Sequence, residues 1–472
     1  MVASLTRATG FTAEFVAHAC GGELHGSGFA KAVTTDSRGA VVTTLFFALR
    51  GATHDGHDHV EAALRGGAAG VVVERLDDNV DLGGAFAVVV ADTRKALGDL
   101  ARAHRARLGA KVVGITGSVG KTTVKEMAAV AFSERSVVAS EKSFNNDIGV
   151  PMTLLRADDT TEVVLCEIGT NAVGEIAALT DIADPDVVVV TFVGRGHLAG
   201  LGDLAGVLRE KSAIITHARP EAVVVLNADD AHFKQLREIA AGRRVVSFGL
   251  THRATVQASS LRMTTKDAAL AVSFDVDIEG KHYGGASLRR PGMHDVRNFL
   301  AVLGIAVATF GPTPEWIAGC VDAAKRIEVT PRRLESKLCA NGVRVLDDTY
   351  NANPESLLAA LAVLDRIRDA KRRVLVLGDM LELGTEAETL HDELGAAAAG
   401  RVDLLVAVGP LAARAGRAFR EESAKLVLDF ADVDALLPEL PLLFGPGDFV
   451  LFKGSRGVAL DRAVDALCGA PS

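Results

Sequence analysis

Continuous runs of β-branched and other apolar residues recur through the middle of the chain and alternate with segments that have the spacing of helices. The runs cover residues 111–115, 163–168, 187–192 and 222–227. Unbroken Val, Ile and Leu runs are typical of parallel strands covered by helices on both faces. This pattern predicts a doubly wound, mainly parallel α/β sheet in the centre of the chain.

The segments on either side follow related patterns. Before the centre, residues 33–75 combine short apolar runs with polar turns, and residues 93–108 have helical spacing, which predicts a small α/β domain. After it, residues 256–283 alternate with a period of two and predict antiparallel strands. The pattern then breaks, and Thr313 and Pro314 suit the cap and first turn of a helix.

Beyond this point, strand patterns at residues 343–347, 374–377 and 449–452 alternate with helices and predict a Rossmann-like α/β domain. The chain has 472 residues, more than one hydrophobic core usually organises. We therefore expect three domains: a small N-terminal α/β domain at residues 1–109, a central doubly wound domain at 110–312 and a C-terminal domain at 313–472.

Composition and charge exclude several classes of protein. The mean hydropathy of +0.24 reflects frequent Ala and Val, and no long apolar span indicates membrane insertion. The net charge of −9 comes without a basic block, which argues against nucleic acid as a partner. Residues 1–7 lack a basic start followed by an apolar stretch, so we expect a cytoplasmic protein. We also expect it to be a monomer.

The cysteines give no sign of a metal site or a disulfide framework. They are odd in number and scattered, and none forms a C-x-x-C pair. We expect all five to be buried small apolar residues: Cys20, Cys166, Cys320, Cys339 and Cys468.

The clearest chemical motif is the loop Gly114-Ile-Thr-Gly-Ser-Val-Gly-Lys-Thr-Thr123. It follows a predicted buried strand and precedes a helix-like segment, which is the context of a phosphate-binding loop. Its three glycines let backbone N–H groups converge on phosphate oxygens, Lys121 reaches the terminal phosphates, and the Thr122 hydroxyl can hold Mg²⁺. Ile115 stands where a glycine is more usual. The alternative, an ordinary glycine-rich turn, is disfavoured because strand, Gly-Lys-Thr and helix coincide.

Other polar residues stand where predicted strands end. Glu167 closes one strand and His197 follows the next, so both can converge on the metal side of a triphosphate. Taken singly, such residues are more often helix caps or solvent-facing. The turn at residues 145–151 carries amides that can bind oxyanions. The same residues are also typical of a plain Asx-rich turn that binds no ligand.

The predicted third domain has three further strand-end clusters, at residues 347–354, 378–384 and 453–457. The first either binds a ligand or caps the next helix, and the sequence favours neither reading. Because several clusters occupy the ligand edges of two sheets, we expect a cleft between domains.

Taken together, these motifs resemble those of the Mur ligases of peptidoglycan synthesis, over the whole chain. The family form of the phosphate loop accounts for Ile115. The clusters at 348–354, 378–384 and 453–456 resemble the branch that adds D-alanyl-D-alanine, and the Asp-Asn-Pro-Arg string of the diaminopimelate-adding branch is absent. Residues 35–38 and 55–58 are similar to the part of the family that binds the UDP-sugar.

The resemblance implies a ligase that uses ATP and Mg²⁺ to join D-Ala-D-Ala to UDP-N-acetylmuramoyl-tripeptide through an acyl phosphate. The implied catalytic residues are Lys121, Lys211 and His197, with Lys211 at the position of a lysine that the family carbamylates. The implied ATP-binding residues are Gly117, Ser118, Gly120, Lys121, Thr122, Thr123, Asn298, Arg333 and Asp347. The implied metal ligands are Thr122, Glu167, His197 and Lys211. The implied substrate-binding residues are Ser37, Arg38, Asn145, Asn146, Asp348, Tyr350, Asn351 and Asn353.

The chain departs from the family pattern at Ala213, Asp295 and residues 42–45. Two alternatives remain at this point: another carboxylate–amine ligase of the superfamily, such as a folylpolyglutamate-type enzyme, and a nucleotide-binding regulator that has lost catalysis.

Overall fold

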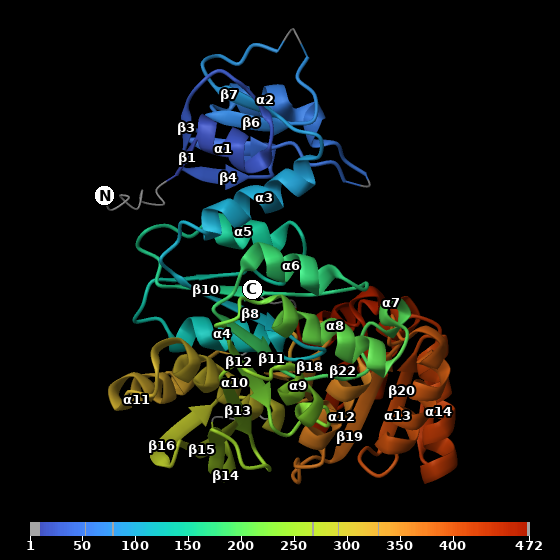
Figure 1. Cartoon of the computed structure of the whole chain (residues 1–472). Helices are drawn as coiled ribbons and strands as arrows, with labels where there is room; N and C mark the ends of the chain where they lie inside the picture. Colours follow the sequence, from blue (N-terminus) through green and yellow to red (C-terminus); the bar gives the residue numbers. More distant parts are fainter. Residues whose placement is uncertain are drawn as a thin grey trace.

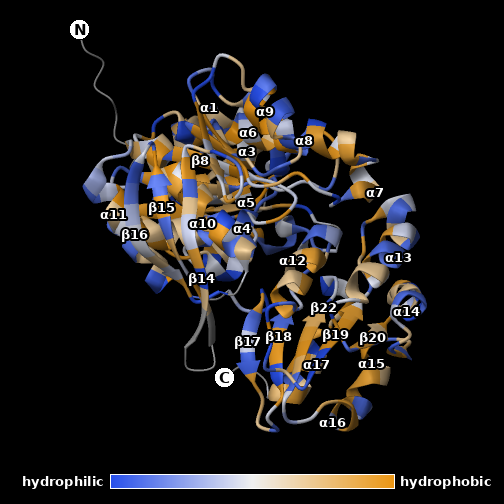
Figure 2. Ribbon diagram, turned by 90° about the horizontal axis from the view of Figure 1, so that it is seen from below, coloured by the Kyte–Doolittle hydropathy of each residue, from blue (hydrophilic) through white to orange (hydrophobic). Residues whose placement is uncertain are grey.

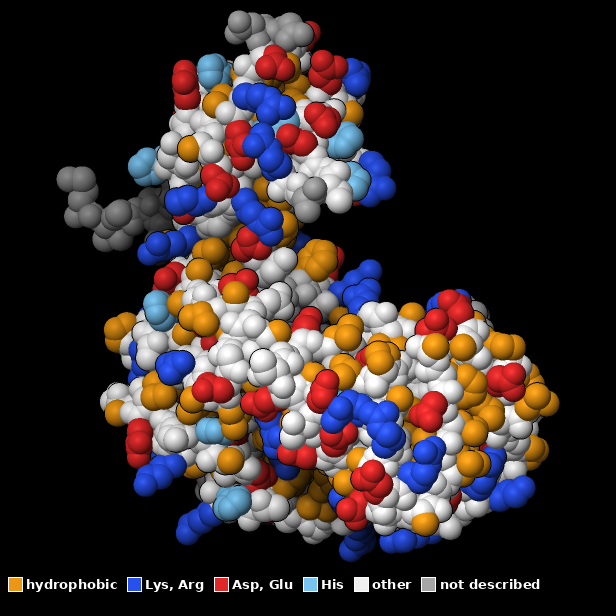
Figure 3. Space-filling view, turned by 90° about the vertical axis from the view of Figure 1, so that its right-hand side faces the viewer, with side chains coloured by type: hydrophobic (Ala, Val, Ile, Leu, Met, Phe, Trp, Pro, Cys, Tyr) orange, Lys and Arg blue, Asp and Glu red, His pale blue; other side chains and the backbone are white. Residues whose placement is uncertain are grey.

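A computed structural model describes residues 10–51, 53–77, 80–266, 269–290, 292–328 and 330–469. Residues 1–7, on which the expectation about export rests, lie outside this part. The chain forms three α/β domains, each built on its own sheet, which confirms the expected fold class. The N-terminal domain stands on the central domain, and the C-terminal domain lies beside the central one (Figure 1). In the space-filling view the N-terminal domain projects away from the other two (Figure 3).

The N-terminal domain holds a five-stranded sheet in the order β2-β7-β6-β5-β4, parallel except for β2. Its last helix, α3, also packs against α5 (Gly149–Leu155) and α6 (Glu175–Ala183) of the central domain. The elements are β1 (Phe11–Thr12), α1 (Ala13–Cys20), β2 (Glu23–His25), β3 (Phe29–Ala30), β4 (Ala32–Thr34), β5 (Thr44–Phe47), α2 (Val60–Arg65), β6 (Gly70–Val73), β7 (Phe86–Val89) and α3 (Thr93–Arg105).

The central domain holds a nine-stranded sheet in the order β16-β15-β14-β13-β12-β11-β8-β10-β9. The strands from β9 to β14 in this order pair in parallel, and β14, β15 and β16 pair antiparallel, as the period-two pattern predicts. Because β8 lies between β10 and β11, the carboxyl ends of these three strands meet at one edge, where ligands bind in such sheets.

The strands of this domain are β8 (Lys111–Thr116), β9 (Val137–Ala139), β10 (Val163–Glu167), β11 (Val187–Val190), β12 (Val223–Asn227), β13 (Val245–Gly249), β14 (Val256–Lys266), β15 (Ala269–Ile278) and β16 (Lys281–Leu288). The helices are α4 (Lys121–Ala131), α5 (Gly149–Leu155), α6 (Glu175–Ala183), α7 (Leu198–Leu201), α8 (Leu204–His217), α9 (Phe233–Ile239), α10 (Met293–Phe310) and α11 (Pro314–Ala323).

Helix α10 is the core helix of the central domain. Within the described ranges it is the one helix whose length and composition would let it cross a membrane, but 61% of it is buried inside the protein. It packs against α4, α11 and the strands β12 and β13. Its apolar surface is therefore accounted for by the domain core.

Helix α11 begins at Pro314 as predicted but does not open the third domain. Trp316 packs against Phe132 and Phe310, and the buried Ile317 and Cys320 belong to the central core. The expected boundary at 312/313 is therefore too early, because the break after α10 is a turn between two helices of one core. We place the boundary between residues 327 and 334.

The C-terminal domain holds a six-stranded sheet in the order β17-β18-β22-β19-β20-β21, parallel except for the edge strand β17. Figure 2 shows the inner strands β19 and β22 as hydrophobic and β17 as hydrophilic, as expected for an edge strand. The strands are β17 (Glu335–Leu338), β18 (Arg344–Asp348), β19 (Arg372–Gly378), β20 (Leu404–Val408), β21 (Leu426–Phe430) and β22 (Asp448–Lys453). The helices are α12 (Pro354–Leu364), α13 (Ala387–Ala398), α14 (Pro410–Ser423), α15 (Val433–Leu436), α16 (Leu440–Leu443) and α17 (Asp461–Cys468).

The expectation for the cysteines is wrong in two respects. Cys339, after β17, and Cys468, at the end of α17, form a disulfide, with Cα atoms 4.3 Å apart. They are separated by 129 residues, so the spacing along the chain gave no sign of this pair. Cys20 and Cys468 are partly exposed, whereas Cys166, Cys320 and Cys339 are buried as expected.

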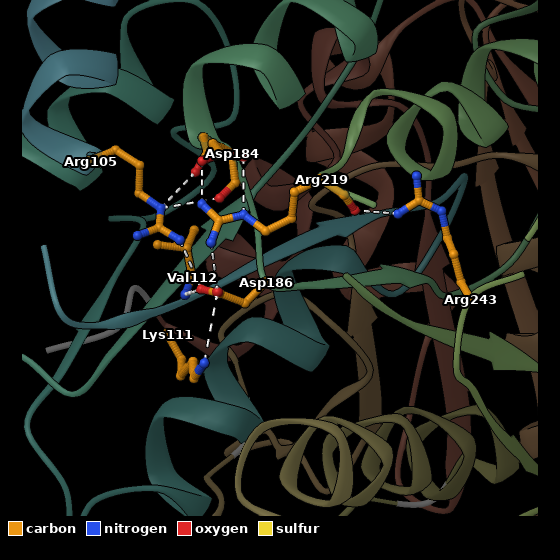
Figure 4. Close-up of polar contacts among 8 residues, drawn as sticks. Arg105, Lys111, Val112, Asp184, Asp186, Arg219 and Arg243 are labelled. Carbon is orange, nitrogen blue, oxygen red and sulfur yellow. Dashed lines mark hydrogen bonds and ion pairs between the residues drawn. The ribbon is translucent and has the colours of Figure 1, made fainter. Parts of the chain in front are cut away.

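A cluster of ion pairs attaches α3 to the central sheet at the end opposite the carboxyl edge (Figure 4). Asp186 accepts from Arg105 at 2.8 Å, from Arg219 at 3.0 Å and from the backbone N–H of Val112 at 2.8 Å. Arg105 also donates to the carbonyl of Asp184 at 3.1 Å. The Arg105 side chain is only 5% exposed, so these partners compensate a buried charge. They also attach the end of α3, the last helix of the N-terminal domain, to the central domain.

Candidate active site

The predicted phosphate loop joins β8 to α4. Gly117 (φ +146°) and Gly120 (φ +88°) have positive φ, and a Cβ would collide with the Thr191 hydroxyl at Gly117 and with Asn298 Oδ1 at Gly120. Gly114, expected to shape the loop, lies inside β8 instead, where a Cβ would press on neighbouring side chains. Two glycines therefore shape the loop and leave the first amides of α4 facing the cleft, where an anion binds favourably.

The loop is fastened to the segment that follows β11. Ser118 donates its hydroxyl hydrogen to the carbonyl of Gly194 at 2.9 Å and accepts from the Gly194 N–H at 3.0 Å. The Ser118 N–H donates to the carbonyl of Phe192 at 2.8 Å. Because the same segment leads to His197, the loop and the histidine hold a fixed relation to each other.

Lys121 is the first residue of α4. Its ammonium donates to the carbonyl of Gly117 at 2.7 Å and so folds back over the loop. Burial lowers the pKa of Lys121, while the Glu167 carboxylate opposes this shift. The side chain thus lies over the space enclosed by the loop amides, as a phosphate-binding lysine requires.

Glu167 ends β10 directly beside the loop and is buried. Its Oε1 accepts from the Thr122 hydroxyl at 3.1 Å and from Asn145 Nδ2 at 2.9 Å. Its Oε2 is buried without a hydrogen-bond partner among the described residues. A carboxylate oxygen left free beside a threonine hydroxyl and a phosphate loop fits Mg²⁺, which binds one or two carboxylates together with phosphates and water.

His197 and Lys211 form the next part of the site. His197 precedes α7 with φ +60°, and burial together with Lys121 and Lys211 lowers its pKa to about 4, so the ring is neutral near pH 7. Lys211, on α8, is fully buried, and its Nζ has no hydrogen-bond partner within the described part of the chain. Burial and Lys121 hold the pKa of Lys211 well below its ordinary value. The His197 imidazole is therefore neutral near pH 7, and burial without a partner favours the uncharged form of the Lys211 amine.

The third domain covers the phosphate loop with the carboxyl end of its sheet. The Arg333 guanidinium lies 4.1 Å from the centre of the Tyr350 ring, and the Tyr350 hydroxyl is 2.8 Å from Ser143 Oγ of the central domain. Glu355 Oε1 accepts from the Arg195 N–H at 2.7 Å. These contacts hold the two domains together around the loop.

Two adjoining cavities lie between the domains. The first, of about 380 Å³, extends from the phosphate loop to Tyr350 and Lys453. The second, of about 390 Å³, shares His197 and Tyr350 with the first and continues to Glu382 and Arg456. The expected cleft between domains is therefore present, with His197 and Tyr350 where its halves meet.

Most predicted site residues of the central and third domains line the first cavity. They are Ser118, Gly120, Lys121, Thr122, Thr123, Asn145, Glu167, His197, Asn298, Arg333, Asp348, Tyr350, Asn351 and Asn353. Ser143, Glu355 and Lys453 also line it. Glu355 and Ser143 were not predicted as site residues, although each lies beside a predicted polar cluster.

Four predicted residues of these domains line neither cavity: Gly117, Lys211, Asp347 and Asn146. Asp347, an expected ATP contact, is fully buried and accepts from Lys337 at 2.7 Å and from the Thr349 hydroxyl at 2.6 Å, so its side chain is directed away from the cavity. Side chains alternate along a strand, so when Asp348 faces the cavity Asp347 faces away. The Asn146 side chain accepts from Gly149 N–H at 2.9 Å at the start of α5 and does not line the cavity.

The predicted residues of the N-terminal domain lie outside both cavities. Ser37 and Arg38 belong to one short turn, in which Arg38 is exposed and pairs with Asp36 at 2.8 Å. The predicted motif at residues 55–58 is tied to the sheet by its histidine: His57 Nδ1 lies 2.6 Å from Asp55 Oδ1, and its Nε2 accepts from the Glu74 N–H at 2.8 Å.

Comparison with known proteins shows which family has this order of domains. The chain matches the Mur ligase family catalytic domain at residues 18–105, the Mur ligase middle domain at 115–306 and the Mur ligase glutamate ligase domain at 332–456. It is 34% identical to the UDP-N-acetylmuramoyl-tripeptide–D-alanyl-D-alanine ligase of Escherichia coli K12, over 94% of this chain and 96% of that protein.

Solved structures agree. MurF from Acinetobacter baumannii superposes with a TM-score of 0.85 at 32% identity, covering 98% of this chain and 99% of that one. MurF from Thermotoga maritima, solved in complex with ADP, superposes with a TM-score of 0.77 at 26% identity, covering 92% and 96%. With sequence and architecture matched along nearly the whole length, the chain belongs to the Mur ligase family.

Proposed function

We propose that the protein is an ATP-dependent ligase that joins D-alanyl-D-alanine to the terminal carboxylate of UDP-N-acetylmuramoyl-tripeptide and releases ADP and phosphate. The observation that carries this proposal is the pair of adjoining cavities that meet at His197 and Tyr350. One contains the phosphate loop and the other opens towards the third-domain motifs. Such a layout brings an activated carboxylate and an amine together, and MurF enzymes are similar to this chain along its whole length.

In the first step the tripeptide carboxylate attacks the γ-phosphorus of ATP, giving an acyl phosphate and ADP. Phosphoryl transfer depends mainly on positioning and on neutralising charge. Here Lys121, the loop amides and Arg333 would surround the phosphates, with Asn298 also lining the nucleotide cavity. Thr122 and Glu167 would hold Mg²⁺, which when bound neutralises phosphate charge.

His197 and Lys211 would support the same region. Burying a charged amine without a hydrogen-bond or ion-pair partner costs free energy, and this cost falls when the amine is uncharged or chemically modified. In its uncharged form, which burial favours, the Lys211 amine can add to CO₂ and lose a proton, and the resulting carbamate would be a second anionic oxygen ligand. We propose His197 as a further metal ligand, although an imidazole suits Mg²⁺ less well than a carboxylate does.

In the second step the amine of D-Ala-D-Ala attacks the acyl carbon and expels phosphate. We propose that the dipeptide lies in the second cavity, near Asn351 and Asn353. Tyr350 and Asp348 would line the path between the cavities. Further closure of the third domain over this space would exclude water and so protect an acyl phosphate from hydrolysis.

The UDP-sugar would extend towards the N-terminal domain, where we propose Ser37 and Arg38 as contacts. Asn145 lines the cavity, and we propose it as a substrate contact. Asn146 is less well supported in this role, because its side chain bonds to the first turn of α5. We further propose a monomeric, cytoplasmic enzyme, since its substrates are cytoplasmic cell-wall precursors.

The test is phosphate release by the purified protein with ATP, Mg²⁺ and UDP-N-acetylmuramoyl-tripeptide, with product identified by mass. Release that requires D-Ala-D-Ala and yields the pentapeptide supports the proposal. Release that occurs only with a different amine would refute it. Tripeptides ending in diaminopimelate and in lysine, compared side by side, identify the third residue that the enzyme accepts.

A further inference from the structure

Arg333, the third-domain cation over the phosphate loop, is held in an unusual turn. The residues on both sides of it, Arg332 (φ +62°) and Leu334 (φ +52°), have left-handed backbone conformations. Such conformations are unfavourable for residues other than glycine. Contacts outside the turn must therefore hold it in place.

The contacts of Arg332 supply much of this support. Its guanidinium lies 3.0 Å from Asp465 Oδ2 through Nη2 and pairs through Nη1 with Asp461. Both carboxylates belong to the last helix, α17, and stand one turn apart. The Arg332 carbonyl accepts from the Tyr350 N–H at 3.1 Å, which joins the turn to the aromatic ring beneath Arg333.

The neighbouring backbone is held in the same way. The Arg332 N–H donates to Glu335 Oε2 at 3.0 Å, and the Leu334 N–H donates to Asp348 Oδ1 at 3.2 Å. The side chain of Arg333 itself has one described contact, the Tyr350 ring at 4.1 Å. Its position thus depends on its neighbours rather than on ion pairs of its own.

Helix α17 is fixed independently of the turn. Its inner face carries the buried Ala463 and Val464, and its last residue, Cys468, is bonded to Cys339 after β17. The turn at Arg332 precedes β17 and Cys339 follows it, so helix α17 contacts the chain on both sides of this strand. Helix α17 is therefore anchored to the sheet of the C-terminal domain by contacts other than those with the turn.

We propose that Arg332 is a positioning residue for nucleotide binding. Its ion pairs with Asp461 and Asp465 attach the turn to helix α17, and the turn held in this way directs the Arg333 side chain into the cavity. This inference rests on the proposed function in one respect, that Arg333 contacts the bound nucleotide. Arg332 does not line the cavity, so its effect is indirect.

The chain offers a matched control. Arg414 also bridges two carboxylates one turn apart, Glu388 at 2.8 Å and Asp392 at 2.6 Å, within the same domain. Its side chain is 32% exposed, against 26% for Arg332. It does not line either cavity. A merely structural ion pair would behave alike at both positions.

The experiment compares Arg332→Ala, Arg332→Lys and Arg414→Ala in the full-length protein. Calorimetry measures the Kd for ADP with Mg²⁺, and steady-state assays measure KM for ATP and for the UDP-tripeptide. For Arg332→Ala we expect the Kd for ADP and the KM for ATP to rise about tenfold, with KM for the UDP-tripeptide nearly unchanged. Arg332→Lys should fall between it and wild type, because lysine keeps the charge but not the two-pronged fork.

Arg414→Ala should change thermal stability without changing nucleotide affinity. Asp465→Asn, a milder change, should also raise the Kd for ADP, and combining it with Arg332→Ala should add nothing further. The inference is overturned if Arg332→Ala or, should that variant not fold, Asp465→Asn binds ADP as wild type does. If wild type binds ADP but does not ligate D-Ala-D-Ala, the proposed function fails while the inference still stands on the binding data.

Discussion

Glu382 Oε2 of the third domain lies 3.0 Å from His197 Nδ1 of the central domain. Both residues have left-handed backbones, at φ +64° and +60°, and the Glu382 carbonyl accepts from the Ala199 N–H at 3.1 Å. The carboxylate and the ring are within ion-pairing distance but lack the alignment of a hydrogen bond. The contact therefore links domain closure to the placement of a proposed metal ligand.

We predict that Glu382→Ala lowers kcat by about tenfold, because residues that orient a ligating histidine typically matter to this degree. Turnover under saturating substrates measures the effect. Glu393→Ala is the control, since Glu393 pairs with Arg195 at 3.2 Å across the same interface without touching His197. Equal losses in the two variants would mean that the interface matters and the histidine contact does not.

The free oxygen of Glu167 gives the sharpest test of the metal site. Glu167→Gln keeps the size of the side chain and an oxygen for Thr122 and Asn145, but it removes the charge and places an amide nitrogen where Mg²⁺ would bind. We expect kcat/KM for ATP to fall by about 100-fold, in the range of a lost transition-state charge contact, with melting temperature nearly unchanged. Titration with Mg²⁺ measures the change. Wild-type Mg²⁺ dependence in this variant would remove Glu167 from the metal site.

Lys211 gives a prediction that does not depend on turnover. Because its amine is buried without a hydrogen-bond partner, and burial lowers its pKa, we expect it to form a carbamate. Protein equilibrated with ¹³C-bicarbonate should show one carbamate carbon signal by NMR. Lys211→Arg should lose this signal together with ligase activity, while Lys125→Arg, at a buried lysine that already donates to the Ser140 carbonyl at 2.9 Å, should keep it. A wild-type spectrum without the signal would leave Lys211 unmodified.

The repetitive apolar runs and strand-end motifs made the fold and most of the central site predictable. A phosphate loop, Glu167 and His197 all follow parallel strands, and parallel topology brings such ends together wherever the connecting helices lie. The choice between Asp347 and Asp348 was harder, because it depends on which face of β18 turns towards the cleft.

Contacts between distant segments were beyond the reach of local patterns. The ion pairs of Arg332 with α17 join segments more than a hundred residues apart, and nothing in either segment marks its partner. Helix α11 was placed in the wrong domain for a similar reason: Thr313-Pro314 marks a helix start, but only the packing of Trp316 shows which core the helix joins.

The disulfide between Cys339 and Cys468 predicts a measurable thiol count and a stability change. Cys20, Cys166 and Cys320 are free, so denatured protein kept without reductant should expose three reactive thiols, and reduced protein five. Loss of the bond should destabilise the third domain by about 2–4 kcal/mol. The double variant Cys339→Ser/Cys468→Ser should show this loss and become insensitive to reductant. Five thiols before reduction would contradict the bond.

A buried histidine should make the third domain sensitive to acid. His391 is fully buried; its Nδ1–H donates to the Ala387 carbonyl at 2.6 Å, and its Nε2 accepts from the Met380 N–H at 3.0 Å. The ring must be neutral to accept from Met380, and burial lowers the pKa of His391 from its ordinary value of 6.5. As the pH falls below 6.5, His391 therefore becomes protonated in the unfolded chain while it stays neutral in the folded chain.

Stability from this group is complete above pH 6.5 and is lost as the pH falls towards the lower folded pKa, by up to about 1.4 kcal/mol per pH unit. We expect hydrogen exchange across residues 378–394 to accelerate between pH 7 and pH 5, after correction for the intrinsic exchange rate. His391→Gln should exchange faster at pH 7, because the Met380 N–H loses its acceptor, and should show a smaller dependence on pH. His282→Gln, at an exposed ring in the central domain, should keep the wild-type dependence in this segment. Equal pH dependence in wild type and His391→Gln would show that the acid sensitivity of this segment arises from other groups.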